Sequence, residues 1–311
     1  MKIICIYHSI DLDGWMSAAI VKLWFEQSLV ITNSNIDSIV DKIDFIGYNY
    51  GQPIPDLSKY DKVIMCDISF PYNNMKELYR SKNTVIWIDH HISAINMLPL
   101  SIEGLRDTKF AACELTWEYF LPYQPMPEIV RLLGLYDSFQ HKGTDEETKV
   151  LEFQYGARQC ISNYEEAYSY LLKSLNPLSE FSCIENDIYN NGKKIYQYLC
   201  TEAKQSYKNG FAIYFRNDIK RGSVIENGIL KFICINKERF NPINFGIDYH
   251  ADGYDGCACF HYANGMWNFS LYNDNGEVDC SVIATQYGGG GHKGAAGFRL
   301  NMTEFIKLLN K

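Results

Sequence analysis

Three short apolar runs in this chain each end in aspartate or histidine, and this recurring pattern limits the folds that the chain can adopt. The runs span residues 3–7, 62–66 and 84–88. Apolar residues at helical spacing lie between them, over 12–26 and again over 72–79. Short β-branched runs without alternation are typical of strands that are buried on both faces of a parallel sheet. Their alternation with helices therefore predicts βαβ units.

The ionisable residues that follow these runs are expected to meet at one edge of the sheet. Ligands of open α/β sheets bind outside the carboxyl ends of the strands. The residues at these positions are His8, Asp11, Asp13, Asp67, Asp89, His90 and His91. Four acids and three imidazoles gathered there would repel one another or remain unpaired. Bound cations would resolve that conflict, so the pattern predicts a metal centre.

Each of these groups also has a purely structural interpretation when it is taken alone. Asp11 and Asp13 precede a predicted helix, which they could simply cap. Asp67 and Asp137 could satisfy turns after the elements that they follow, although Asp137 could also reach the same sheet edge as a further ligand. Gly14 would let the backbone approach the cluster closely.

Length and a change of pattern along the chain predict two domains joined by a helix. A chain of 311 residues exceeds the size at which one core usually keeps growing. We predict a parallel-sheet α/β domain over 1–183, a helical connector over 184–208 and a smaller α+β domain over 209–311. Within the last domain, Asn264-Gly265 between two alternating runs predicts a β-hairpin.

Composition and charge restrict the class of protein. The net charge of -8 disfavours coating of long nucleic acid, but it allows a local basic pocket for a small anion. No apolar stretch approaches the roughly 20 residues that span a bilayer, and the start MKIICIYHS enters a strand without a cleavage site. The ten cysteines contain no CxxC pair, which is typical of reduced cytosolic proteins. We therefore expect a soluble cytoplasmic protein without a membrane partner.

A glycine run over residues 288–297 (GGGGHKGAAG) is a candidate anion site. Backbone amides without side chains can point into one concavity and hold a phosphate or carboxylate. A helix expected from Ala295 onward would add its N-terminus. A flexible hairpin or linker is the alternative, but the small residues after His292 indicate close packing. A last helix is expected after Thr303, which would be its N-cap.

Five ordered motifs resemble those of the DHH phosphoesterase superfamily. HSIDLDG, VIMCDIS, VIWIDHH and YDSF are similar to its four N-terminal motifs, and IATQYGGGGHKGAAGF is similar to the glycine-rich signature of its DHHA1 domain. The resemblance implies a DHH catalytic domain, a DHHA1 substrate-binding domain and an active site in the cleft between them. ACELTWEYFLP and GLYDSF resemble the NrnB-like oligoribonuclease, or nanoRNase, branch.

The resemblance also implies a role for each ionisable residue at the sheet edge. One divalent ion would be held by His8, Asp11 and Asp67. The other would be held by Asp13, Asp67, His90 and Asp137, so that Asp67 bridges the two ions. His91 would contact the scissile phosphate, and Asp89 would orient a histidine, as metal sites commonly require.

Substrate contacts are expected from the second domain. The candidates are Gly289, Gly290, Gly291, His292, Ser270, Tyr272, Lys293 and Arg299. Relatives usually carry an arginine in Ser-Leu-Arg-Ser, where this chain has Tyr272. Tyr272 could stack on a base instead, and Lys293 or Arg299 could replace the missing charge.

The activity implied by the resemblance is a manganese-dependent phosphodiesterase that shortens small oligonucleotides to mononucleotides with two divalent ions. Mixed imidazole and carboxylate ligands favour Mn²⁺ over Mg²⁺. Hydrolysis of cyclic or linear signalling dinucleotides or of adenosine 3',5'-bisphosphate is the enzymatic alternative, and a nucleotide-binding module without catalysis is another. The expected partner is a short oligonucleotide or nucleotide and not a long duplex. A homodimer is compatible with the sequence.

Overall fold

A computed structural model describes residues 2–32, 42–81, 84–98, 101–175, 181–221, 224–238 and 240–309. The chain divides into two compact units, Met1–Ile195 and Tyr196–Lys311. The division falls within the long helix α8 (Phe181–Lys208), in the segment where the sequence predicts a helical connector. The nine cysteines whose side chains are described are all unbridged. The side chain of Cys183 lies outside the described part.

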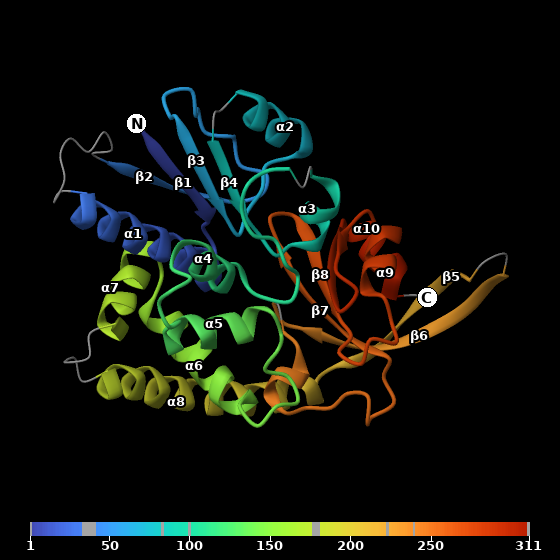
Figure 1. The fold of residues 1–311 in the computed structure, drawn as a ribbon. Helices are drawn as coiled ribbons and strands as arrows, with labels where there is room; N and C mark the ends of the chain where they lie inside the picture. The colour runs from blue at the N-terminus through green and yellow to red at the C-terminus, as the bar shows by residue number, and fades with distance from the viewer. Residues whose placement is uncertain are drawn as a thin grey trace. The chain divides into compact units, whose positions relative to one another are not determined.

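A parallel sheet of four strands forms the centre of the first unit, in the order β2-β1-β3-β4 (Figure 1). The strands are β1 (Ile3–His8), β2 (Ile43–Tyr48), β3 (Lys62–Cys66) and β4 (Thr84–Ile88). Parallel strands covered on both faces must be apolar throughout, and β1 is buried along its whole length. The predicted α/β class of this unit is thus confirmed.

Successive residues of these strands alternate between two apolar cores. Ile3 and Cys5 of β1 face one core, and Ile4 and Ile6 face the other. The first core is covered by α1 (Leu12–Thr32), α4 (Ala112–Phe120), α5 (Glu128–Asp137), α6 (Glu147–Cys160), α7 (Tyr164–Leu175) and the first part of α8. The second is covered by α2 (Tyr72–Ser81) and α3 (Ile92–Met97). Both faces of the sheet are therefore covered by helices, and a ligand can reach the sheet at the ends of its strands.

The second unit contains a mixed sheet of six strands in the order β5-β6-β7-β8-β10-β9, in which β6 and β7 are parallel. The strands are β5 (Phe211–Arg221), β6 (Val224–Asn236), β7 (Gly256–Ala263), β8 (Met266–Tyr272), β9 (Gly290–Gly291) and β10 (Ala295–Leu300). A short 3-10 helix, η1 (Pro242–Phe245), follows β6. Helices α9 (Cys280–Gln286) and α10 (Met302–Leu309) pack on one face of the sheet.

The predicted hairpin is confirmed. β7 and β8 pair antiparallel, with Ala263 opposite Met266, which leaves a two-residue turn. Asn264 and Gly265 have φ angles of 53° and 79°. Positive φ at both positions is the requirement of a type I′ turn, which Asn-Gly meets at the lowest cost.

Two predictions near the C-terminus are wrong. Residues from Ala295 form strand β10 instead of a helix, because Ala296, Phe298 and Leu300 alternate into the core with the period of a strand. Thr303 is not the N-cap of the last helix. The side chain of Asn301 accepts a hydrogen bond from the amide of Glu304 (3.0 Å), and the Glu304 side chain accepts one from the amide of Asn301 (2.9 Å), so a capping box starts α10 one residue after Asn301.

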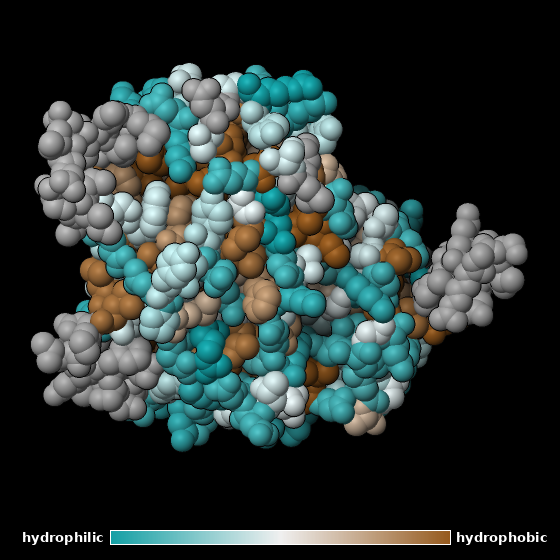
Figure 2. Space-filling model, viewed as in Figure 1, coloured by the Kyte–Doolittle hydropathy of each residue, from teal (hydrophilic) through white to brown (hydrophobic). Residues whose placement is uncertain are grey.

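None of the described helices combines the length and apolar character that crossing a bilayer requires. On the face shown in Figure 2, hydrophilic residues predominate and apolar residues form small separate patches.

Candidate metal centre

The carboxyl ends of β1, β3 and β4 bring histidine and aspartate side chains together at one edge of the first unit's sheet. Because β1 pairs with β3, His8 lies beside Asp67, and its Nδ1 is 3.2 Å from Asp67 Oδ2. The same nitrogen is 2.8 Å from Oδ2 of Asp11. From the end of β4, Nε2 of His90 lies 3.4 Å from the other Asp67 oxygen, Oδ1.

The Asp67 carboxylate thus stands between two groups of possible ligand atoms. Its Oδ2 faces His8 and Asp11. Its Oδ1 faces His90, whose Nε2 is also 3.2 Å from Asp137 Oδ2. Asp13 completes the second group, with its Oδ2 3.7 Å from the same nitrogen. The structure therefore brings together all six predicted metal ligands, and their assignment to particular ions stays a prediction.

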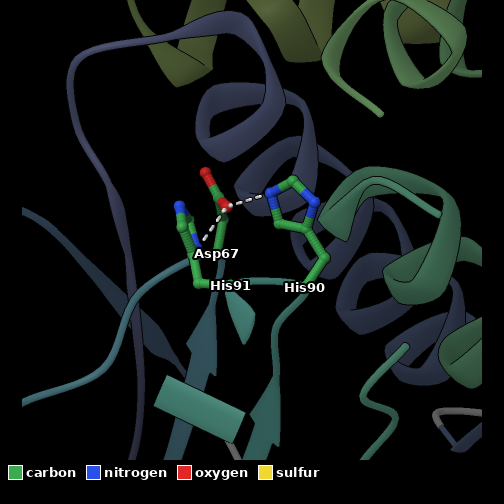
Figure 3. A group of neighbouring side chains, drawn as sticks. All are labelled: Asp67, His90 and His91. Carbon is green, nitrogen blue, oxygen red and sulfur yellow. Dashed lines mark ion pairs between the residues drawn. The ribbon is translucent and has the colours of Figure 1, made fainter. Parts of the chain in front are cut away.

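His91 approaches Asp67 from the opposite side to His90, as Figure 3 shows. Its Nδ1 is 3.6 Å from Asp67 Oδ1 and 2.8 Å from Oδ1 of Asp89. The Asp89 side chain is completely buried and also accepts hydrogen bonds from the amides of His90 (2.8 Å) and His91 (3.0 Å) and from the indole of Trp87 (3.0 Å). Burial alone would raise the pKa of Asp89, but the hydrogen bond with His91 keeps it below the usual value. A charged Asp89 therefore holds the His91 ring by Nδ1 and leaves Nε2 free to meet a ligand.

The backbone of Asp67 adopts a strained conformation. Its φ is 62°, a left-handed value that residues other than glycine rarely adopt, and its amide donates to the carbonyl of Ile88 (2.9 Å). Such conformations cost about 1 kcal/mol or more and cluster at functional sites. Here the strain directs the carboxylate into the cluster at a position that is 1% exposed.

Asp13 and Asp11 are held by different backbone amides. Both Asp13 oxygens accept from the first turn of α4, at the amides of Ala112 (2.9 Å) and Cys113 (2.7 Å). The positive end of that helix favours the charged carboxylate. Asp11 does cap α1 through the Gly14 amide (3.0 Å), so the capping and ligand roles coexist in this residue.

Without a cation the cluster is electrostatically unfavourable. Burial, followed by the charge of Asp67, raises the pKa of Asp13 to about 6, and burial with the charge of Asp13 raises the pKa of Asp137 to about 7. Burial alone would lower the pKa values of His8 and His90, but the surrounding carboxylates raise both to about 10. Oδ1 of Asp67 is buried without a hydrogen bond. Divalent cations fit this set, because they would supply the charge and the partner that its oxygens lack.

Three residues at this edge were not predicted from the sequence, namely Glu114, Tyr50 and Ser69. Glu114 is buried beside Asp13 and accepts from the amide of Ala111 (3.0 Å). Tyr50 places its ring centroid 6.0 Å from that of His8 and 6.2 Å from that of His91, and its phenol faces Ser69. Tyr50 lies two residues after the end of β2, at the same sheet edge as the ligands.

The predicted substrate residues all lie in the second unit, but the glycine run is not an open loop. Gly290–Gly291 forms strand β9 against β10. The amide of Gly289 donates to the carbonyl of Ala284 (2.9 Å), and that of His292 to the carbonyl of Ala295 (2.7 Å). These two amides are therefore already engaged within the unit.

The remaining predicted substrate residues are distributed over the β8–β10 region. Ser270 and Arg299 line a pocket of about 620 Å³, together with Gly289. Tyr272 is partly buried two residues further along β8 than Ser270. Lys293 is exposed in the turn that joins β9 and β10.

Comparison with known proteins identifies the class. Residues 2–135 match the DHH family, N-terminal domain. Together with the parallel sheet and the ligand-rich strand ends, this match identifies residues 2–135 as a DHH N-terminal domain and supports the resemblance to the DHH phosphoesterase superfamily. The NrnB-like branch stays a prediction.

Individual relatives are distant. The uncharacterized protein R106 of Acanthamoeba polyphaga mimivirus is 26% identical over 318 residues, which include 94% of this chain, and the chain spans 66% of the length of that relative. An exopolyphosphatase-related protein from Bacteroides fragilis superposes with a TM-score of 0.52 at 14% identity, over 99% of this chain and 90% of that one. The pGpG-specific phosphodiesterase PggH from Vibrio cholerae gives a TM-score of 0.49 at 12% identity, over 99% and 96% of the two chains. The Bacteroides protein thus shares the fold.

Proposed function

We propose that this protein is a metal-dependent phosphodiesterase that hydrolyses oligonucleotides of a few residues, including dinucleotides, to mononucleotides. The observation that carries the proposal is the position of the Asp67 carboxylate, with Oδ2 toward His8 and Asp11 and Oδ1 toward His90. Two divalent ions bound in such a paired site supply an activated water and neutralise charge during in-line displacement at phosphorus. Both ligand groups belong to the first unit.

The chain's own residues have separate tasks in this proposal. His8 and Asp11 would hold one ion, Asp13, His90 and Asp137 the other, and Asp67 would join them. His91 would donate from Nε2 to a phosphoryl oxygen, where negative charge accumulates in the transition state. Asp89 would accept from the Nδ1–H of the charged imidazole, so that the Nε2–H of the same ring is left to donate to the phosphate.

Manganese is the metal that the donor set favours. Two of the six proposed ligands are imidazoles, and Mg²⁺ prefers oxygen ligands alone and retains its waters. We further infer that the protein acts in the cytoplasm, where cysteines such as the nine unbridged ones remain reduced.

The second unit is the proposed substrate-binding domain. The lining of its pocket includes Arg299, Ser270 and Asn268, and these cationic and polar side chains suit a phosphate or sugar. A pocket of this size accommodates one or two nucleotides and not an extended strand. We therefore expect short substrates.

One assay distinguishes between the possible substrates. Purified protein with Mn²⁺ would be given RNA and DNA dinucleotides, a 24-mer, adenosine 3',5'-bisphosphate, cyclic dinucleotides and pyrophosphate. We expect the dinucleotides to be hydrolysed fastest. Failure to hydrolyse any dinucleotide, with the protein folded and metal-loaded, refutes the proposal. Preference for a cyclic dinucleotide or the bisphosphate would identify the alternative substrate.

A further inference from the structure

An aromatic side chain outside the ligand set stands at the candidate metal centre. Tyr50 follows β2, and the end of that strand is held beside the end of β1 because the amide of Ser9, the residue after His8, donates to the Tyr48 carbonyl (3.1 Å). The ring centroid of Tyr50 is 6.0 Å from that of His8, with an interplanar angle of 59°. It is 6.2 Å from that of His91, at 81°. Tyr50 therefore contacts both a proposed metal ligand and the proposed phosphate donor.

Tyr50 is anchored at two points. Its amide donates to the side chain of Asn49 (2.8 Å), within a turn that is closed by the Gln52 amide bonding to the Asn49 carbonyl (3.1 Å). Its phenol faces the hydroxyl and amide of Ser69, a residue that is 5% exposed. Burial, then the charges of Asp89 and Asp67, raise the pKa of the phenol, which keeps it neutral. The ring is thus held in place before any ligand arrives.

Half of Tyr50 nevertheless remains exposed to solvent, with a relative exposure of 50%. Other apolar residues next to proposed ligands are similarly exposed, namely Ile10 at 50% and Ile92 at 47%. The ring of Tyr50 is fixed, half-exposed and close to the proposed phosphate site. It can therefore stack on a planar group that is attached to the bound phosphate. Nucleobases are such groups, and base–aromatic stacking tolerates any base.

We propose that Tyr50 is a specificity-determining residue that stacks on the nucleobase adjoining the scissile phosphate. This inference rests on the proposed function. It adds that the substrate must carry a nucleobase next to the phosphodiester that is hydrolysed. The ring, not the hydroxyl, makes the contact, because the phenol end is turned toward Ser69.

Steady-state kinetics test the inference with the full-length, Mn²⁺-loaded protein. A dinucleotide would be compared with its abasic analogue, which keeps the phosphodiester and the sugars. In Tyr50→Leu we expect KM for the dinucleotide to rise about 10- to 100-fold, as loss of one stacked base predicts. KM for the abasic analogue should be unchanged, and kcat for both should be retained. Tyr50→Phe keeps the ring and loses only the phenol at Ser69, so its KM for the dinucleotide should rise much less than that of Tyr50→Leu.

A matched control is Tyr79→Leu, since Tyr79 is similarly exposed (40%) but lies on α2. We expect it to leave both substrates unaffected. An unchanged dinucleotide KM in Tyr50→Leu, in an active protein, overturns the inference. So does an equal fall in kcat for both substrates, because that result means that Tyr50 only supports His8 and His91.

Binding measurements keep this test separate from the test of the proposed function. Calorimetric titration of the Mn²⁺-loaded protein with AMP and with ribose 5-phosphate needs no turnover. We expect Tyr50→Leu to weaken AMP binding about 10- to 100-fold and to leave ribose 5-phosphate unaffected. If no dinucleotide is hydrolysed but AMP shows this loss, the proposed function fails and the stacking role stands. Equal AMP affinity in the two proteins refutes the stacking role.

Discussion

At the scale of single residues, Asp67 is the position on which both ligand groups depend. Asp67→Asn keeps the shape, and asparagine tolerates the left-handed φ of 62°, but the substitution removes the negative charge that both groups share. We expect kcat to fall about a thousandfold or more, which is roughly 4 kcal/mol, and calorimetric metal binding to fall below two ions per chain. The exposed Asp145 provides the control, Asp145→Asn. Wild-type turnover in Asp67→Asn would contradict the bridging role.

Because His8 and His90 are both proposed metal ligands, we expect metal binding to depend on pH. In the metal-free protein the pKa values of His8 and His90 are about 10, so both imidazoles are charged at pH 7. Their folded pKa values lie above the ordinary 6.5, so their contribution to stability is complete below about pH 6.5 and is lost as pH rises through 10. Metal ligation requires the neutral ring, and binding must therefore release protons.

We expect metal affinity to increase as pH rises from 6.5 toward 10, with up to two imidazole protons released at pH 8. Calorimetry in buffers of different ionisation enthalpy measures this release directly. Binding enthalpies that do not vary with the buffer would show that the histidines are not ligands.

At the scale of elements, the junction between β1 and α1 requires glycine. A Cβ atom at Gly14 would lie 2.1 Å from the carbonyl oxygen of His8. Alanine is intrinsically the better helix residue by about 1 kcal/mol, but this overlap forces the helix away from the strand. We expect Gly14→Ala to lower the free energy of unfolding by about 1–3 kcal/mol and to weaken metal binding.

Chemical denaturation measures the cost at Gly14, and Gly290→Ala is its control. Gly290 has open space around the position of a Cβ atom and an ordinary φ. Its substitution should change stability by less than about 0.5 kcal/mol. A Gly14→Ala protein that is more stable than the wild type would mean that the contact between β1 and α1 is not as close as described.

The cluster at the strand ends was predictable from the sequence. Strands that are buried on both faces are apolar throughout, and the carboxyl ends of parallel strands lie at the same edge of the sheet. The segment after the glycine run was mistaken for a helix because Ala295-Ala296-Gly297 carries no strong strand propensity. Its conformation is set by pairing with β8, a tertiary contact that outweighs local preference. Tyr50 was missed for a related reason. Its role depends on β2 lying beside β1, which the order of strands along the chain does not reveal.

At the scale of the whole molecule, the net charge and the size of the pocket support the proposed restriction to short substrates. A chain with a net charge of -8 repels a long polyanion except where metals and a few cationic groups bind phosphate. With one or two phosphate contacts, raising salt from about 50 to 200 mM should lower kcat/KM for a dinucleotide only about 3- to 7-fold, as counterion release from single strands predicts.

The measurement compares a dinucleotide with a 24-mer over this range of salt at saturating Mn²⁺. We expect the 24-mer to be the poorer substrate, because its additional phosphates approach a protein whose net charge is -8. The 24-mer should show no steeper salt dependence than the dinucleotide, because the proposal gives it no additional phosphate contacts. A loss of more than about a hundredfold for the 24-mer would indicate five or more phosphate contacts. That result would mean that the protein binds long single strands despite its acidic balance, and the restriction to short substrates would then be wrong.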